Sequence, residues 1–276
     1  MFHLSAFADE ISPDPDEQIR VCKDNGVTHF ELRSVNKINV LDFDRRLRQE
    51  IKSKLVESGL GVICIGSPIG KVKIDELWEK HFDRFKIAVE LAEFFAAPLI
   101  RIFSYYPEPG GDISRRRDEV IRRMQDKVDY IKDRPVTLVH ENEKEIFGDT
   151  GSRCLDLMQT INSPKFRSAF DFANFIQCGE QPLDNWASLK PYSVHIHIKD
   201  AKLGSGQIVP AGEGDGQLEP ILVDLHRSGY DGFVSLEPHL SAAGKMGGFS
   251  GPELFKVAAD ALKKLCSRND IPIASA

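Results

Sequence analysis

The chain has 276 residues, of which 41% are hydrophobic, and a formal net charge of −6 at pH 7. This length allows one large buried core, so we expect a single domain over residues 1–276. The acidic balance argues against a nucleic acid or an anionic membrane as partner, because binding to either depends on many lysines and arginines.

Short apolar runs alternate with longer charged segments of helical spacing, which is the βα repeat typical of a parallel sheet. The predicted strands are Phe2–Ala8, Thr28–Arg33, Gly61–Gly66, Pro98–Phe103, Val136–Glu141, Phe166–Asp171, Tyr192–His197 and Gly232–Glu237. The predicted helices are Asp16–Asn25, Asp44–Ser58, Asp75–Phe95, Ser114–Asp133, Gly151–Ile161, Leu183–Leu189, Leu218–Ser228 and Pro252–Cys266. Eight strands with eight helices predict a closed α/β (β/α)8 TIM barrel, since an open sheet of that many strands would normally need a longer chain.

Two glycine-rich stretches, Gly204–Gly216 and Ala242–Gly251, follow the seventh and eighth predicted strands. Loops that follow barrel strands lie at the C-terminal face, where TIM barrels carry their active sites. We therefore expect these stretches to cover an active site.

The seventh predicted strand carries polar residues on one face. Side chains alternate along a strand, so His195, His197 and Lys199 point one way and the isoleucines between them point the other. A polar inner face indicates a metal or substrate site at the end of the strand. The alternative is one hydrogen-bonded core histidine and one histidine with a surface contact.

Four predicted strands end in groups that bind metals, namely Glu141, Asp171, His197 and Glu237. Three carboxylates beside an imidazole at one barrel mouth would repel one another unless a cation, which the imidazole can also bind, held them. Oxygen-rich ligation with a single histidine suits Mn²⁺, Mg²⁺ or Co²⁺ better than Zn²⁺. The sequence therefore predicts one divalent metal ion, and for any single carboxylate the alternative is a helix cap or a salt bridge.

The motifs near the strand ends are Val139–Glu143, Phe170–Asn174, Val194–Asp200, Pro210–Asp215 and Ser235–His239. Together they resemble the xylose isomerase-like TIM-barrel superfamily, which includes sugar phosphate isomerases and epimerases, ketose 3-epimerases, inosose and 3-dehydroshikimate dehydratases, and endonuclease IV. The resemblance covers nearly the whole chain. It implies that the four residues above hold one divalent metal, and that Glu141 and Glu237 exchange the α-proton of a keto sugar from opposite faces.

The chemistry of such a reaction explains this arrangement. A carbon-bound proton next to a ketone is far less acidic than any side chain, so the enediolate must be stabilised. A divalent ion does so as a Lewis acid, while a carboxylate on each face takes the proton from one side and returns it from the other.

Several positions depart from the related families. Ketose epimerases carry a histidine where this chain has Asn174 and an arginine where it has Leu203, which argues against epimerisation of a free ketose of that type. Endonuclease IV needs additional metal-binding histidines, but this chain has Ser67, Ser104 and Asn174 in the corresponding regions. DNA repair is therefore disfavoured.

Basic groups near the strand ends suit a carboxylate or phosphate on the substrate. They are Arg33, Lys71, Arg101 and Lys199. For each of them the alternative is a solvated loop cation, and Arg33 and Lys71 are the strongest candidates.

Three further residues complete the predicted substrate-binding set, namely Glu143, Asn174 and His239. Glu143 would orient Lys199 or bind a substrate hydroxyl, and His239 is either a substrate contact or an exposed loop histidine. His195 lies one layer deeper than His197, so we expect it to support the metal site rather than to bind the metal.

The leading hypothesis is a metal-dependent isomerase or epimerase of a sugar, sugar phosphate or sugar acid. The second is a metal-dependent dehydratase of keto-polyols, in which the same enediolate expels a hydroxyl. The third is a non-catalytic sugar-binding barrel. All three have a small carbohydrate as partner, and none decides whether the chain forms a homo-oligomer.

The chain shows no feature of export or of membrane insertion. Its N-terminus lacks the basic start and apolar core of a signal peptide, and no run approaches about 18 apolar residues. The five cysteines are odd in number and show no CxxC spacing, which argues against a disulfide framework. We therefore expect a soluble, cytoplasmic protein with reduced, mostly buried cysteines.

Overall fold

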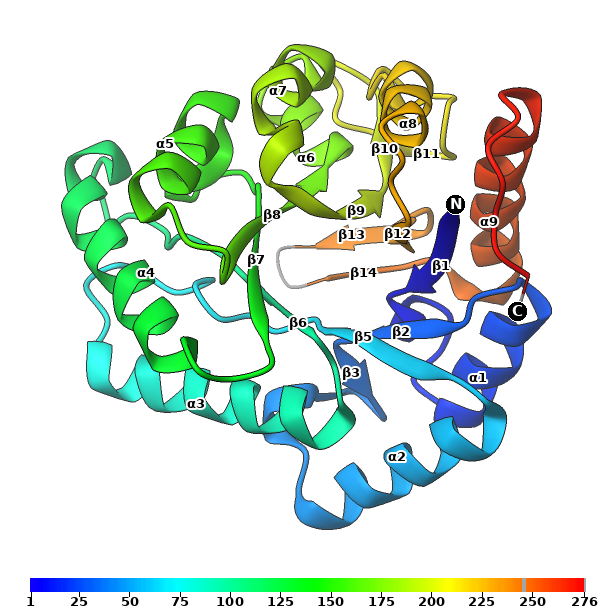
Figure 1. Ribbon diagram of the computed structural model, residues 1–276, viewed down its shortest axis with the longest axis horizontal. Helices are drawn as coiled ribbons and strands as arrows, with labels where there is room; N and C mark the ends of the chain where they lie inside the picture. Colours follow the sequence, from blue (N-terminus) through cyan, green and yellow to red (C-terminus); the bar gives the residue numbers. More distant parts are fainter. Residues whose placement is uncertain (245–246, 276) are drawn as a thin grey trace.

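Parallel strands close into the predicted barrel in the computed structural model, which describes residues 1–244 and 247–275 (Figure 1). The strands are hydrogen-bonded in the order β1-β12-β9-β8-β7-β6-β5-β2. Their bounds are β1 Phe2–Ala6, β2 His29–Leu32, β5 Gly61–Ile65, β6 Leu99–Ile102, β7 Thr137–Glu141, β8 Phe166–Asp171, β9 Ser193–Ile198 and β12 Gly232–Leu236. Each overlaps a predicted strand, so the fold prediction is confirmed.

Helices surround the barrel (Figure 1). They are α1 Pro15–Asp24, α2 Arg45–Ser58, α3 Trp78–Phe95, α4 Arg117–Ile131, α5 Gly151–Ile161, α6 Phe172–Gln177, α7 Pro182–Leu189, α8 Leu218–Arg227 and α9 Gly251–Arg268. The sequence analysis missed only α6 among these. Five of its six residues are buried, so it has no polar face to give the helical period. Asp171 caps this helix by accepting a hydrogen bond from the backbone N–H of Asn174.

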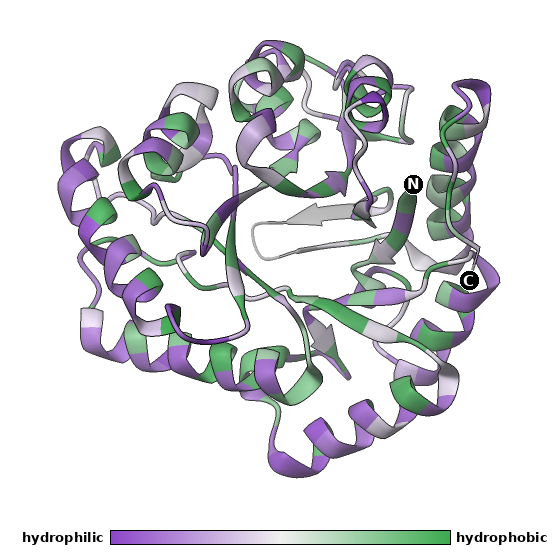
Figure 2. Ribbon diagram, viewed as in Figure 1, coloured by the Kyte–Doolittle hydropathy of each residue, from purple (hydrophilic) through white to green (hydrophobic). Residues whose placement is uncertain are grey.

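Two apolar clusters support the barrel. The larger one lies between the strands and the helices, which carry both hydrophilic and hydrophobic residues (Figure 2). The smaller one comprises Ile63, Cys64, Val139 and Ala169, all on barrel strands. Val139 and Ala169 lie two residues before Glu141 and Asp171, so they share the inward face of their strands. The register between β2 and β5 shifts at Ile63, which allows the adjacent residues Ile63 and Cys64 to belong to the same cluster. The barrel is therefore a packed core.

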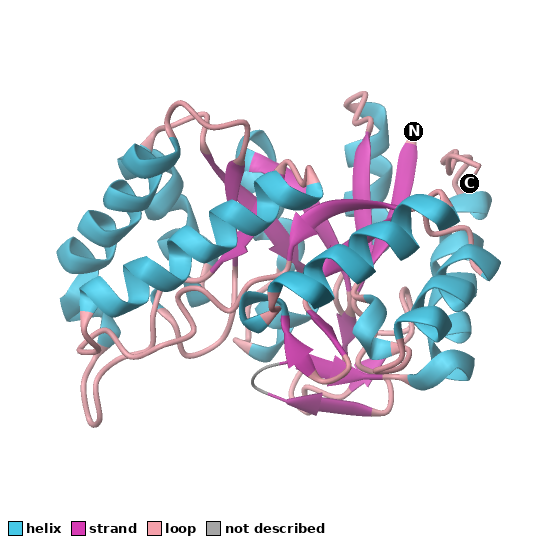
Figure 3. Cartoon of the chain, turned by 90° about the horizontal axis from the view of Figure 1, so that it is seen from below, coloured by secondary structure: helices cyan, strands magenta, loops and turns pink. Residues whose placement is uncertain are grey.

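Three short hairpins follow barrel strands, and the sequence analysis did not predict them. Their strands are β3 Ser34–Val35 with β4 Ile38–Asn39, β10 Asp200–Ala201 with β11 Ile208–Val209, and β13 Ala242–Gly244 with β14 Gly247–Phe249. Figure 3 shows short strands gathered beside the C-terminal ends of the barrel strands. Of the predicted loop Ala242–Gly251, residues 245 and 246 lie outside the described residues, as does the last residue of the predicted domain, Ala276.

The loop after β11 wraps around one carboxylate. Oδ1 of Asp200 accepts hydrogen bonds from the backbone N–H groups of Ala201 and Gly216, at 2.8 and 2.9 Å. Its Oδ2 accepts from Gly212 and Gly214, both at 2.9 Å. The glycine-rich stretch is thus held at the barrel mouth by a side chain that directly follows the seventh barrel strand.

All five cysteines are free and four of them are buried, as the sequence analysis expects. Within residues 1–244 and 247–275, no helix combines the length and the apolar character needed to cross a membrane.

Two glycines with positive φ give a test of the backbone packing. A Cβ on Gly59 (φ 73°) would meet nothing within 4 Å, but one on Gly70 (φ 93°) would lie 1.9 Å from the carbonyl oxygen of Phe103. We expect Gly59→Ala to lower the free energy of unfolding by about 1–2 kcal/mol, the cost of a left-handed conformation. Gly70→Ala should cost about 3 kcal/mol or more, because the backbone must also move. Urea unfolding measures both variants, and equal losses would contradict the close approach at Gly70.

Candidate active site

Four side chains meet where β7, β8, β9 and β12 end. Glu141 and Asp171 are the last residues of β7 and β8, His197 lies in β9, and Glu237 follows β12. Each offers one metal-ligating atom, and these atoms all lie within 4.8 Å of one another. The four side chains are buried, with at most 2% exposure. They are neighbours in space because β7, β8, β9 and β12 are consecutive in the barrel.

The imidazole of His197 faces the three carboxylates. Its Nδ1 lies 3.3 Å from Glu141 Oε1, 3.5 Å from Glu237 Oε2 and 4.0 Å from Asp171 Oδ2. Neither ring nitrogen of His197 has a hydrogen bond. Buried polar atoms normally have a partner, and a nitrogen with three carboxylates is a donor set for a divalent cation. The residues present therefore fit a metal ion.

Two predicted cations lie against these carboxylates. Lys199 Nζ is 2.7 Å from Asp171 Oδ2 and 3.2 Å from Glu237 Oε2. Arg101 Nη1 is 3.1 Å from Glu141 Oε2. Neither is a solvated loop cation, since both are at least 95% buried. They balance part of the negative charge of the cluster.

The predicted cation Arg33 reaches the same cluster from β2. Its Nη1 lies 3.1 Å from Glu237 Oε1, and its Nε donates to Asp9 Oδ2 at 2.8 Å. The guanidinium groups of Arg33 and Arg101 both pack on the ring of Phe7, at 4.5 and 4.8 Å from its centroid. Phe7 thus orders two cations beside Glu237.

Charge and burial act in opposite directions on the carboxyl groups. Burial raises the pKa of Asp171 to about 6, against the opposing effect of Lys199. For Glu141, burial is outweighed by His197 and Arg101, which lower its pKa to about 2. Lys199 and His239 likewise outweigh burial and hold the pKa of Glu237 well below its usual range. At neutral pH, all three groups are therefore mainly carboxylates, able to bind a cation or accept a proton.

Two asparagines fix the positions of Glu141 and Asp171. The Asn142 amide donates to the Asp171 carbonyl and accepts from the Asp171 backbone N–H, both at 2.9 Å. Asn174 Nδ2 donates to Glu141 Oε1 at 3.2 Å and to the Asn142 carbonyl at 2.9 Å. The structure thus places the predicted substrate contact Asn174 against a carboxylate of the cluster.

The predicted residues Lys71 and Glu143 pair with each other at the mouth. Lys71 Nζ donates to Glu143 Oε2 at 2.7 Å and lies 4.3 Å from the centroid of the Phe103 ring. Both side chains are largely buried, with 9% and 12% exposure. Glu143 therefore pairs with Lys71, whereas the carboxylate partners of Lys199 are Asp171 and Glu237.

His239 is largely covered in the site, with 9% of its side chain exposed, and is not an exposed loop residue. Its Nε2 lies 3.0 Å from Glu10 Oε1 and 3.4 Å from Glu237 Oε1. Burial opposes protonation, but Glu10 and Glu237 raise the pKa of His239 to about 9. Arg33 is also near, with its Nη2 3.8 Å from Glu10 Oε1. Glu10, Glu237 and His239 form a second group of possible metal ligands, and the charges of His239 and Arg33 already balance its carboxylates.

The sequence analysis missed Glu10 and Glu31. Glu10 ends the short 3-10 helix Ala8–Glu10 after β1, and its Oε2 accepts from the backbone N–H of His239 at 2.7 Å and from Ser250 Oγ at 3.1 Å. Glu31 lies in β2, and its Oε2 is 2.7 Å from Nε2 of His195. The signal for Glu31 was its spacing of two residues from Arg33, which puts both side chains on the inner face of one strand.

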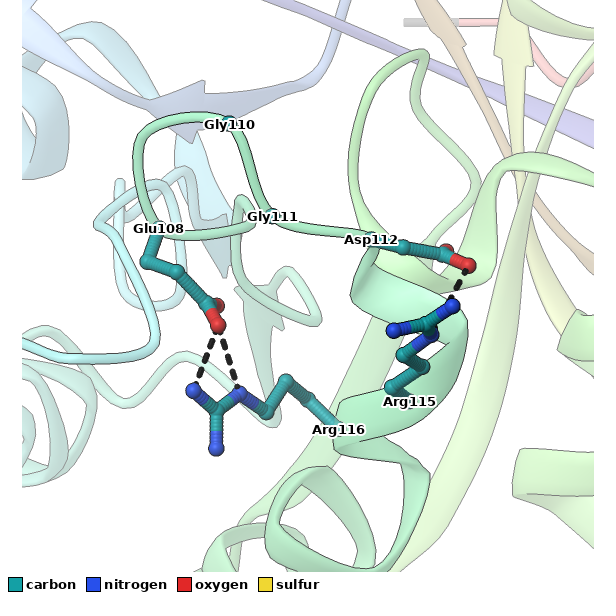
Figure 4. Close-up of a pocket in the computed structure, with 6 residues that line it drawn as sticks. All are labelled: Glu108, Gly110, Gly111, Asp112, Arg115 and Arg116. Atoms are coloured by element: carbon teal, nitrogen blue, oxygen red, sulfur yellow. Dashed lines mark hydrogen bonds and ion pairs between the residues drawn. The ribbon is translucent and has the colours of Figure 1, made fainter.

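A separate hollow is lined by residues 108–116, in the chain segment that connects β6 to α4, and none of the predicted site residues lines it. Figure 4 shows ion pairs between Arg116 and Glu108 and between Arg115 and Asp112 along its wall. Its arginines are substantially exposed, so these pairs contribute little to stability.

The family profile of the xylose isomerase-like TIM barrel matches residues 19–265. The chain therefore belongs to this family. An L-ribulose-5-phosphate 3-epimerase of Escherichia coli strain SE11 is 24% identical to it over 234 residues, which cover 80% of this chain and 81% of the relative.

Solved structures also share the fold. The probable 3-DHS dehydratase AsbF of Bacillus anthracis has a TM-score of 0.76 at 18% identity, and the match covers 95% of this chain and 99% of AsbF. The D-allulose 3-epimerase of Methylomonas sp. in complex with D-allulose has a TM-score of 0.76 at 14% identity, with 97% of each chain covered. At these identities, the likeness shows the shared barrel.

The Asn142 amide gives a test of how the carboxylates are held. Asn142→Ala removes the side chain that bonds to both the N–H and the carbonyl of Asp171, and we expect the free energy of unfolding to fall by about 2–3 kcal/mol. Asn269→Ala is the control, since that amide is half-buried and bonds to Glu219 and the Leu265 carbonyl near the surface. It should cost about 1 kcal/mol or less. Urea unfolding compares the two, and a smaller loss at Asn142 would contradict its bracing role.

Proposed function

We propose that the protein is a divalent-metal-dependent isomerase or epimerase of a sugar or sugar derivative, and that it moves a proton on a carbon next to a carbonyl. The observation that carries this proposal is the convergence of Glu141, Asp171, His197 and Glu237 within 4.8 Å. The curated relative, an L-ribulose-5-phosphate 3-epimerase, supports the same reaction class and a carbohydrate substrate.

Those four side chains would hold the metal. Their one nitrogen and three carboxylates favour Mn²⁺, Mg²⁺ or Co²⁺ over Zn²⁺. When bound, the ion would supply Lewis-acid polarisation of the substrate oxygens. The unpartnered Nδ1 of His197 supports this assignment.

Glu141 and Glu237 would transfer the proton. In the barrel order, β7 and β12 are separated by β9 and β8, so the two carboxylates enter from either side of Asp171 and His197. Both have a lowered pKa and are ionised at neutral pH. One carboxylate would take the carbon-bound proton, and the other, after taking up a proton from water, would deliver it to the opposite face, which inverts that carbon. The first carboxylate would then release its proton to water, which restores both groups to the ionised form.

The buried cations would bind the oxygens of the substrate. Lys199 contacts Glu237 and Arg101 contacts Glu141, the two carboxylates proposed to move the proton. The N–H groups of both cations would therefore donate to the negative charge that develops on the substrate oxygen. Arg33 and Lys71 would contact an anionic group of a substrate that carries one.

A dehydratase is the second candidate, and one observation favours it. Lys199 and His239 lie 3.2 and 3.4 Å from oxygens of Glu237, and both have a raised pKa, so both carry a proton at neutral pH. The pKa of His239, about 9, makes it the better acid of the two, whereas the strongly raised pKa of Lys199 favours a fixed positive charge. An acid next to the base could protonate a leaving hydroxyl while Glu237 accepts the carbon-bound proton. Incubation of keto-sugars and keto-inositols in D₂O with NMR detection separates the two reactions. Deuterium uptake without loss of water indicates an isomerase or epimerase, and a new enone or deoxy-ketone indicates a dehydratase.

Metal binding can be tested by removal of the one nitrogen ligand. We expect one divalent ion per chain in the wild type and a loss of affinity of about 100-fold or more in His197→Ala, with the fold intact, because this ligand lies at the strand end. His3→Ala is the control, since that histidine is partly exposed and pairs with Asp231. Calorimetric titration with Mn²⁺ and Co²⁺ measures the affinity. Full occupancy of the site by the metal ion in His197→Ala would contradict the assignment of His197 as a metal ligand.

Proton transfer can be tested at Glu237. Glu237→Gln keeps the shape and an oxygen ligand but removes the basicity, so we expect turnover to fall by about 10²–10⁴-fold with near-native substrate binding. Exchange of the substrate α-proton with D₂O should fall in parallel. Glu57→Gln, on the exposed face of α2, should change neither. Native exchange in Glu237→Gln would leave Glu237 as a ligand only and would strengthen the dehydratase reading.

A further inference from the structure

We propose that Glu31 is a positioning residue that accepts the Nε2–H groups of both His195 and His197, and so commits Nδ1 of His197 to the metal. The inference rests on the metal site of the proposed function. It adds a residue from the far wall of the barrel that touches none of the three carboxylate ligands in the described residues.

The geometry around Glu31 is that of one acceptor between two donors. Its Oε2 lies 2.7 Å from Nε2 of His195 and 3.2 Å from Nε2 of His197. The two imidazole rings are 5.2 Å apart and nearly perpendicular, at 87°. His195 is hydrogen-bonded to this oxygen, and His197 faces the same oxygen with its Nε2 at ion-pair distance. All three side chains are fully buried, so water does not compete for these contacts.

The chemistry of the groups then sets the tautomer. An ionised carboxylate only accepts hydrogen bonds, so each Nε2 that faces Glu31 must carry the hydrogen. An imidazole that binds a metal is neutral and has a single N–H, so a hydrogen on Nε2 would leave Nδ1 of His197 with the lone pair for the metal. That lone pair faces the oxygens of Glu141, Glu237 and Asp171 at 3.3–4.0 Å. Such an arrangement suits a cation between them.

The position of Glu31 explains why β9 has two histidines. β2 and β9 are not neighbours in the barrel order, so Glu31 reaches His197 across the interior. His195 shares the same oxygen at the shorter distance and therefore helps to hold the carboxylate in place. Carboxylates that accept the outer N–H of a metal-binding histidine fix its ring and raise its basicity, and their loss typically weakens metal binding by about 10–100-fold.

Two variants separate this role from mere core packing. Glu31→Met removes the acceptor but fills similar space, and we expect the dissociation constant for Mn²⁺ or Co²⁺ to rise by about 10–100-fold. Glu31→Gln retains an oxygen that can accept from both Nε2–H groups, so most of the affinity should return, to within about 10-fold of the wild type. Cys22→Ala is the matched control, because Cys22 is a buried cysteine of α1 that belongs to none of the groups of possible metal ligands among the described residues. It should leave the affinity unchanged.

A spectroscopic readout identifies the ligand atom directly. In the ¹⁵N-histidine-labelled protein loaded with ¹¹³Cd²⁺, we expect coupling of cadmium to Nδ1 of His197 and a downfield Nε2–H signal from its hydrogen bond to Glu31. This proton signal should persist in Glu31→Gln and move upfield in Glu31→Met. A purely structural role would lower the urea unfolding midpoint without changing the coupling, the proton shift or the metal affinity.

The outcomes distinguish this inference from the proposed function. Coupling of cadmium to Nε2, or wild-type affinity in Glu31→Met, would overturn the role of Glu31 and leave the enzyme assignment standing. If Glu31→Met does not fold, the coupled nitrogen of the wild type and the proton signal of Glu31→Gln still decide the question. A wild-type protein that binds no divalent ion would instead overturn the proposed function.

Discussion

The burial of several like charges at one end of the barrel is the constraint on which the rest of the site depends. Ionised carboxylates away from water are strongly unfavourable unless cations or hydrogen-bond donors compensate them. Arg33, Arg101 and Lys199 supply that compensation, and each arises from an inward-facing position near the end of a strand. The barrel brings these charges together, because strands far apart in the chain place their inward-facing side chains around one axis. The site is therefore a network of charges in which no member is independent of its neighbours.

The fold could be predicted from the sequence because its signals are local. Each barrel strand is a run of four to six residues with apolar side chains on at least one face, and each long helix has one buried and one polar face. The elements that escaped prediction lack such a signal. Helix α6 is buried almost all round, and the strands of the three hairpins have only two or three residues. Their existence depends on contacts with segments elsewhere in the barrel.

The site was predictable to the extent that strand ends mark a barrel mouth. Glu141 and Glu237 could be found in this way, whereas Glu31 sits inside a strand and gains its meaning from His195, 164 residues away. His239 shows the same limit. In a sequence, residues that follow a strand cannot be told from an exposed loop. The contact that covers His239 is made by Glu10, 229 positions earlier in the chain. Contacts between residues so far apart in the chain form only when the barrel closes, and the spacing of apolar residues in the sequence does not predict them.

The way in which Glu10 holds the segment between His239 and Ser250 bears on how this barrel could acquire new specificities. The Glu10 carboxylate accepts hydrogen bonds from the backbone N–H of His239 and from the hydroxyl of Ser250. The Ser250 backbone N–H in turn donates to the Glu10 carbonyl at 2.9 Å. Both ends of the segment are thus clamped at neighbouring points on the rim. Lengthening a loop whose ends are already fixed adds little closure entropy, since each doubling costs only about 0.6 kcal/mol. A longer chain between these two points would therefore add little entropic cost, and the contacts of Glu10 with His239 and Ser250 would stay in place.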